Sequence, residues 1–268
     1  PQVIRRTKAD VARDLPDKIP VPCRLPMSNE QRALYVGATQ RFNAAHGDDE
    51  QARMHHLALL RYLRLVCADP RPIDVAAFVP EAPDWYHRKA PKMQWLVETL
   101  RAIQSRREKA LLFAEDREVQ RLLQHYISAD FGFAPRMVNG YTSVSAKSNA
   151  SRQRIASEFQ SAPGFGVLIL SPLAAGFGLN IQGANHVIHY LRHWNPAKED
   201  QATDRAYRIG QTKDVHVYCP LAVASDFKTF DVKLDELLAR KRELAVDMLQ
   251  GTGAVSSDEF DLSEIAPA

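Results

Sequence analysis

The sequence lacks the Gly-x-x-x-x-Gly-Lys-Ser/Thr loop that cradles the phosphates of the nucleotide in P-loop ATPases. The nearest approach, residues 140–148, has no second glycine before its lysine. No apolar run ends in an acidic pair suited to Mg²⁺, and no Gly-x-Ser-x-Gly elbow is present. These absences exclude a complete P-loop ATPase site and a serine-hydrolase elbow within this sequence.

Long apolar runs and paired cysteines are also missing. No run of about eighteen apolar residues is present, so the sequence predicts no membrane span. Residues 1–10 have no apolar segment of the kind found in signal peptides and are typical of a cut inside a longer polypeptide. Cys23, Cys67 and Cys219 are far apart and without Cys-x-x-Cys spacing, which predicts a reducing compartment, no disulfide framework and no zinc site. The net charge of +3 permits a local basic groove without demonstrating nucleic-acid binding.

The first ninety residues predict helices between irregular segments. Residues 1–30 are rich in basic residues and proline, which predicts an extended lead-in. Ser28 is a predicted helix cap, and apolar residues at helical spacing predict a second helix over residues 57–66. Residues 43–53 are expected to form a loop, and residues 70–90 a linker or surface loop.

From Pro91 onward, helical patterns alternate with short apolar runs. A helical stripe over residues 93–103 precedes the first run, and Asp116 is expected to cap the helix that follows it. This alternation predicts an α/β domain with a mainly parallel sheet. A helix is expected from about residue 227 to residue 249, with the basic run 240–242 on a solvated face, and a short docking helix near the end. The predicted strands are residues 110–114, 136–138, 167–171, 186–190 and 215–219.

The stretch Asn195–Gln211 has the strongest chemical pattern. Asn195 and Pro196 predict a helix start, and Gly210 predicts its end. On such a helix Gln201, Arg205 and Arg208 would share one face, because they are four and three residues apart. Two guanidinium groups and an amide on one face suit phosphate oxygens, although a solvated helix face is the alternative.

A glycine-containing loop follows the apolar run 167–171. Gly176 and Gly178 are two residues apart, and Asn180 follows them. Because parallel sheets bind ligands at the carboxyl ends of their strands, this loop is a candidate for approach to a phosphate. A simple tight turn is the other interpretation of the same glycines.

The segment from Ala175 to Tyr218 closely resembles the second motor lobe of Swi/Snf-type ATPases, which are DNA translocases of helicase superfamily two. The Trp-Asn-Pro group and the Gln-Ala-x-x-Arg-Ala-x-Arg-Ile-Gly-Gln-Thr pattern carry the match. The resemblance implies a RecA-like lobe over 91–225, preceded by a lead-in and helical protrusion over 1–90 and followed by a brace helix and tail over 226–268. It extends over nearly the whole chain, through residues 5–18, 63–70, 91–100, 110–127 and 234–245.

For the active site, the resemblance implies half of an ATPase. ATP and Mg²⁺ would be bound mainly by an N-terminal RecA-like lobe of the same polypeptide, and no metal ligand is expected in this chain. Arg205 and Arg208 would be arginine fingers with Gln201 beside them. Gly176, Gly178 and Asn180 would couple the nucleotide cleft to DNA. The fragment alone is expected to be inactive.

For the partner, the resemblance implies the backbone of double-stranded DNA, contacted by Gly140, Arg152 and Asn180, with a nucleoprotein complex as a further candidate. Glu115 and Asp116 replace the Ser-Gln usual in the family and add negative charge on this side. Such departures suggest a divergent branch, located in the cytoplasm or nucleoid if bacterial and in the nucleus if eukaryotic. A non-catalytic RecA-like module for interaction or DNA docking is the alternative.

Overall fold

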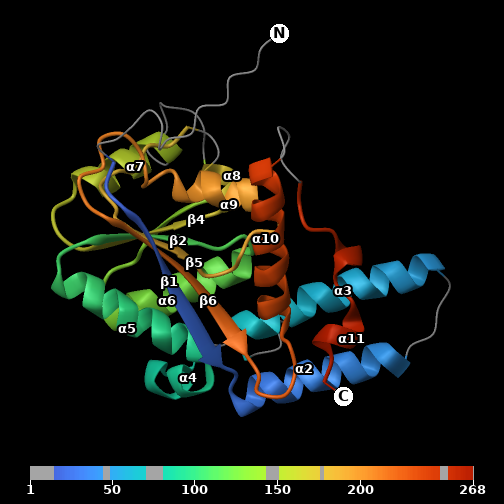
Figure 1. Cartoon of the computed structure of the whole chain (residues 1–268). Helices are drawn as coiled ribbons and strands as arrows, with labels where there is room; N and C mark the ends of the chain where they lie inside the picture. The colour runs from blue at the N-terminus through green and yellow to red at the C-terminus, as the bar shows by residue number, and fades with distance from the viewer. Residues whose placement is uncertain are drawn as a thin grey trace, which may run out of the picture.

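Six parallel strands form one sheet in the computed structural model, which describes residues 15–44, 49–70, 81–142, 151–175, 178–247 and 253–267 (Figure 1). The strand order is β1-β6-β5-β2-β4-β3, and every pairing is parallel. The predicted α/β architecture with a parallel sheet is therefore confirmed. The strands are β1 (Lys18–Pro26), β2 (Lys109–Phe113), β3 (Arg136–Val138), β4 (Gly166–Leu170), β5 (His186–His189) and β6 (Val215–Val223).

Helices cover both faces of the sheet. In Figure 1, α5 and α6 lie on one side and α7, α8 and α9 on the other, while α2, α3, α10 and α11 gather at one end of the molecule. The helices are α2 (Asn29–Ala44), α3 (Asp49–Ala68), α4 (Pro83–Lys89), α5 (Pro91–Ser105), α6 (Arg117–Phe131), α7 (Arg152–Ser161), α8 (Pro172–Ala175), α9 (Pro196–Thr203), α10 (Phe230–Asp247), the 3₁₀ helix η1 (Ser257–Glu259) and α11 (Leu262–Ile265).

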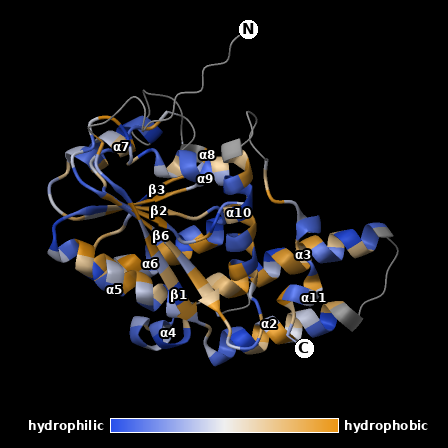
Figure 2. Ribbon diagram, viewed as in Figure 1, coloured by the Kyte–Doolittle hydropathy of each residue, from blue (hydrophilic) through white to orange (hydrophobic). Residues whose placement is uncertain are grey.

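The central strands are largely hydrophobic, as their colour in Figure 2 shows, and their side chains are buried on both faces of the sheet. All five residues of β2 are buried. Leu112 and Ile169 point into the core beneath α5 and α6, whereas Leu111 and Leu168 point into the core beneath α7 and α9. Because parallel strands are covered on both sides, they are continuously apolar, and this is why short apolar runs identified them in the sequence.

A third core joins the two ends of the chain. Tyr35 of α2 and Leu63 of α3 pack with Phe230 and Leu234 of α10. Phe260 stacks on Phe230 with ring centroids 4.9 Å apart, and Ile265 of α11 is fully buried in the same core. The short docking helix predicted near the C-terminus is confirmed.

Two predictions for the first ninety residues were wrong, and a third was incomplete. The described part of the lead-in is extended as predicted, but it also contains strand β1, which pairs with β6 along its whole length and tolerates three prolines because it is an edge strand. The expected loop 43–53 already belongs to α3 from Asp49, although residues 45–48 lie outside the described parts. The expected linker 70–90 contains α4, whose buried Tyr86 stacks on Tyr126 at 4.0 Å, whereas residues 71–80 are not described. Local sequence gave no sign of these tertiary contacts.

A buried ion pair connects the sheet-covering helix α5 to α10. Lys92 Nζ lies 2.6 Å from Asp231 Oδ2, with side chains only 2% and 5% exposed. The same carboxylate oxygen accepts the backbone N–H of Ala222 at 2.9 Å. We expect Asp231→Ala to lower the free energy of unfolding by about 3–5 kcal/mol, since it leaves a buried ammonium without its partner.

Urea unfolding measures this loss, and Glu118→Ala is the matched control. Glu118 pairs with Arg121 at 2.7 Å on the surface of α6, so its removal should cost less than about 1 kcal/mol. If Asp231→Ala and Glu118→Ala lower the free energy of unfolding equally, the buried position of the Lys92–Asp231 pair does not increase the cost of breaking it.

Candidate functional site

Helix α9 begins as predicted and is fixed by a buried carboxylate. Asn195 Oδ1 accepts the N–H groups of Ala197 at 2.9 Å and Lys198 at 3.3 Å, and Pro196 occupies the first turn. Glu199 accepts hydrogen bonds from Arg192 Nε at 3.0 and 2.9 Å. It also accepts the His193 N–H at 3.0 Å, so α9 is fastened to the chain leaving β5.

The same carboxylate fastens α9 to α10. Arg242 donates to Glu199 at 2.8 Å and to Asp200 at 3.0 Å, and Arg192 also pairs with Asp235 of α10. Burial would raise the pKa of Glu199, but the positive charges of Arg192 and Arg242 outweigh it and hold that pKa well below its usual range. The prediction of a solvated face for residues 240–242 was therefore wrong for Arg242.

The helix ends at Thr203, so the expectation of a single helix through Gly210 was wrong. The Arg205 and Ala206 N–H groups bond back only three residues, to Ala202 at 3.2 Å and Thr203 at 3.1 Å, which is the tighter geometry of a final turn. The Arg205 carbonyl then accepts the N–H of Ile181 at 3.0 Å. This bond to a distant loop replaces the next bond of the helix.

Gln211 and Gly210 hold the segment beyond α9. The buried Gln211 amide donates to the carbonyls of Gln182 at 3.0 Å, Ala184 at 2.9 Å and Ala206 at 3.2 Å. Gly210 has φ +99°, and a β-carbon there would lie only 3.0 Å from the Gln182 amide. The backbone conformation therefore favours glycine at this position, and a larger residue would also displace the Gln182 side chain.

The two arginines differ in exposure but influence each other. Arg205 is 7% exposed and donates to the Leu179 carbonyl at 3.4 Å, whereas Arg208 and Gln201 are exposed. Burial and then the positive charge of Arg208 lower the pKa of Arg205. Two neighbouring guanidinium groups that repel each other form a site that an anion would stabilise.

The structure brings Arg205 together with the loop that follows β4. Arg205 contacts Leu179 and Ile181 on either side of Asn180, which is itself exposed. Gly178 is exposed and has φ +73°, a conformation that favours glycine. Gly176 lies outside the described residues.

Gly140 and Arg152 lie together at the carboxyl end of β3. Arg152 is 6% exposed, and its guanidinium donates to the carbonyls of Thr142 at 3.1 Å and Gly140 at 3.4 Å. Gly140 is exposed on the turn that these bonds hold. Arg152 thus faces the turn, rather than solvent as expected for a direct contact with DNA.

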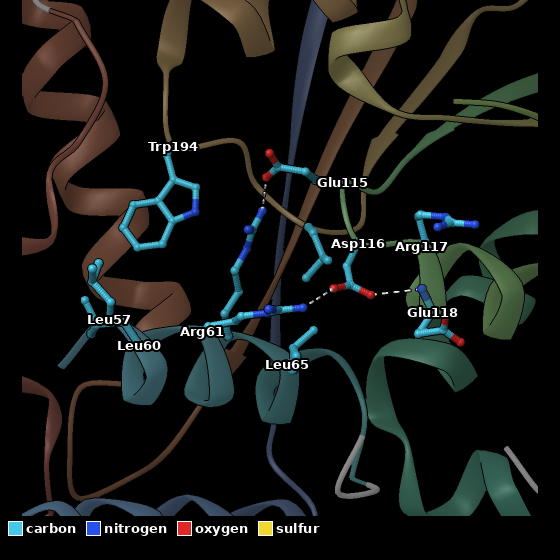
Figure 3. Close-up of a pocket in the computed structure, with 11 residues that line it drawn as sticks. Leu57, Leu60, Arg61, Leu65, Glu115, Asp116, Arg117, Glu118 and Trp194 are labelled. Carbon is cyan, nitrogen blue, oxygen red and sulfur yellow. Dashed lines mark hydrogen bonds and ion pairs between the residues drawn. The ribbon is translucent and has the colours of Figure 1, made fainter. Parts of the chain in front are cut away.

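Glu115 and Asp116 border a hollow of about 590 Å³ between α3 and the start of α6 (Figure 3). Arg64 pairs with Glu115 at 3.1 Å, and Arg61 with Asp116 at 3.7 Å. Asp116 also accepts the Glu118 N–H at 2.9 Å, which confirms it as the cap of α6. Arginines of α3 therefore compensate the negative charge that the sequence places here.

Comparison with known proteins identifies the fold and its family. The model of the helicase conserved C-terminal domain matches residues 91–210. The Sulfolobus solfataricus SWI2/SNF2 ATPase core in complex with dsDNA is similar to the chain with a TM-score of 0.65 and 30% identity, over 92% of this chain and 49% of that chain. The chain belongs to the C-terminal helicase lobes of Swi/Snf-family ATPases. The resemblance seen in the sequence and the RecA-like fold are confirmed.

Curated relatives of this helicase lobe include bacterial proteins. The Zorya protein ZorD of Escherichia coli O139:H28 is 48% identical, over 97% of this chain and 24% of ZorD. The putative ATP-dependent helicase/translocase YwqA of Bacillus subtilis is 33% identical, over 93% of this chain and 26% of YwqA. The lobe thus spans about a quarter of the length of these relatives.

Within the described parts of the lobe, no group of three or more His, Cys, Asp or Glu residues is placed to hold a metal ion. None of the described helices is long and apolar enough to cross a membrane. Sequence reasoning missed the roles of Glu199, Arg192 and Gln211, which support the arginines. Glu199 lies between the Trp-Asn-Pro group and the pattern that begins at Gln201, and its partners on α10 could not be read from spacing.

An acid-sensitive contact holds the chain after Gln211 against the start of β2. Glu108 accepts from Lys213 at 2.9 Å and from His186 Nε2 at 2.7 Å. Burial lowers the pKa of His186, so this imidazole is neutral at pH 7 and its Nδ1 faces the Tyr218 hydroxyl. Burial alone would raise the pKa of Glu108, but hydrogen bonds from His186, Lys213 and Asn185 outweigh it and lower that pKa to about 2.

We expect Glu108→Gln to lower the free energy of unfolding by about 2–3 kcal/mol near neutral pH. A carboxyl whose pKa is lowered on folding stabilises the protein above its ordinary pKa of 4.5, and the stabilisation is lost as the pH falls towards about 2. Urea unfolding of both proteins between pH 2 and 7 should show the difference shrinking over that range. A difference that does not change with pH would contradict this origin.

Proposed function

We propose that this chain is the second motor lobe of an ATP-dependent double-stranded-DNA translocase or remodeller. It would complete an ATPase site together with an N-terminal RecA-like lobe of the same polypeptide. The observation that supports this most directly is the pair Arg205 and Arg208, one buried and one exposed, whose charges repel each other. No described residue forms an ion pair with Arg208, so its guanidinium is available to an anion from outside the lobe.

The arginine pair fits the phosphates of ATP. Bound ATP would supply the phosphoryl group to be transferred, with Mg²⁺ held mainly by the other lobe. Arg208 would stabilise the charge that develops on the transferring group, as arginine fingers do. Arg205, held against the Leu179 carbonyl, would add a fixed positive charge behind it, and Gln201 would lie beside the nucleotide.

The loop containing Gly176, Gly178 and Asn180 would couple the two ligands. Arg205 contacts this loop on both sides of Asn180, so these two contacts would join the nucleotide side of the site directly to Asn180. Asn180 and Gly140 are exposed and would contact the DNA backbone. Arg152 would act indirectly, because its hydrogen bonds to the Thr142 and Gly140 carbonyls hold the turn that presents Gly140 to the DNA. A nucleoprotein complex remains a candidate substrate, and the nucleoid is the expected location if the protein is bacterial.

We expect Arg208→Ala to reduce DNA-stimulated ATP turnover by about 10³-fold or more in a polypeptide that joins this chain to its N-terminal lobe. Nucleotide affinity should be largely unchanged, because the lost contact acts mainly in the transition state. Steady-state ATPase kinetics and nucleotide titration measure the two effects.

Arg101→Ala is the matched control, since Arg101 is an exposed arginine of α5 paired with Asp130 at 3.2 Å, and turnover should be unchanged. The 268-residue chain alone should show no DNA-stimulated turnover, as it lacks a P-loop. Normal turnover by the Arg208 variant, or turnover by the chain alone, would contradict the proposed division of the site.

A further inference from the structure

An exposed tyrosine and an arginine stack on each other at the carboxyl edge of the sheet. Tyr141 follows β3 and is 78% exposed, which is more than any other large hydrophobic side chain among the described residues. The guanidinium carbon of Arg117, at the start of α6, lies 4.0 Å from the centre of the Tyr141 ring. In Figure 3 Arg117 points away from the hollow beside α3. Stacking fixes the guanidinium plane while leaving its N–H edges able to donate.

The turn that carries Tyr141 is held from its buried side. Asn139 donates from its side chain to Gln120 Oε1 at 3.0 Å and accepts the Tyr141 N–H at 3.1 Å. Thr142 Oγ1 accepts the Asn139 N–H at 3.0 Å, and Arg152 donates to the carbonyls on both sides of Tyr141. A ring on so constrained a turn loses little entropy when it binds a partner.

The charge around this stacked pair favours an anion. The nearby acids are each paired, Glu115 with Arg64, Asp116 with Arg61 and Glu118 with Arg121. Arg117 forms no ion pair with any residue that the structure describes.

We propose that Tyr141 and Arg117 together bind a phosphate of the DNA backbone, the Tyr141 hydroxyl and the Arg117 guanidinium donating to its oxygens. This inference rests on the proposed function and assigns one of its DNA contacts to two residues, Tyr141 and Arg117, for which the resemblance implied no role. A protein partner is less suited to the pair, because none of the other exposed large hydrophobic residues described belongs to this turn or to the first turn of α6. An aromatic ring without an apolar surround fits a phosphate better than an interface core.

The test is binding of a short fluorescent DNA duplex to the 268-residue chain, measured by anisotropy from about 20 to 200 mM salt. Arg117→Ala should weaken binding roughly tenfold at the lowest salt and reduce the slope of log K against log salt by about 1. Tyr141→Ala should weaken binding several-fold, and Tyr141→Phe should also weaken it, because it keeps the ring but removes the hydroxyl that donates to the phosphate. Two duplexes of unrelated sequence should give the same results, because a phosphate contact does not read bases.

Arg101→Ala is the matched control, because it removes the same charge from the exposed surface of α5, where Arg101 pairs with Asp130 at 3.2 Å. It should change affinity by no more than about twofold. Equal losses for Arg117→Ala and Arg101→Ala, or unchanged binding by both Tyr141→Ala and Arg117→Ala, would overturn the assignment. The proposed function would then stand, and the Tyr141–Arg117 pair would become a candidate protein contact. Absence of salt-dependent binding by the unmodified chain would instead contradict the DNA-binding part of the proposed function.

Discussion

The buried Glu199 carboxylate is the contact on which the position of the arginine segment depends. It accepts hydrogen bonds from Arg192 and His193, which lead out of β5, and from Arg242 of α10. A buried carboxylate is tolerated only where such partners offset its desolvation. These hydrogen bonds join the start of α9 to the chain that follows β5 and to α10. The segment that carries Arg205 and Arg208 therefore begins from a helix whose position is fixed.

Beyond the end of α9, the two arginines are held by tertiary contacts and not by a helix. The Arg205 carbonyl accepts a hydrogen bond from the Ile181 N–H, and the Gln211 side-chain amide donates to three backbone carbonyls. Breaking off the helix at Thr203 allows Arg205 to face the Asn180 loop while Arg208 stays exposed. The same arrangement therefore buries Arg205 and leaves Arg208 exposed, and the proposed ATPase site shared between two lobes would use this geometry.

Sequence predicted most of the fold because its signals are local. Apolar runs gave the buried strands, and Ser28, Asp116 and Asn195 cap helices as expected. Strand β1 was missed because proline is tolerated in edge strands but not in central strands, and the sequence does not reveal that β1 lies at the edge of the sheet. In the site, the roles of Arg205 and Arg208 stay predictions, and the end of α9 depends on Ile181 and Gln211, whose contacts spacing cannot reveal. The burial of Arg152 was equally hidden.

A structure of the chain joined to its N-terminal lobe, with Mg²⁺, ADP and a mimic of the transferring phosphoryl group bound, tests the central claim most directly. The account predicts that α9 still ends at Thr203 and that the Arg208 guanidinium lies within hydrogen-bond distance of the mimic, with Arg205 behind it against Leu179. A closed complex in which the Arg208 guanidinium points away from the nucleotide, or in which α9 extends through Arg208, would contradict it.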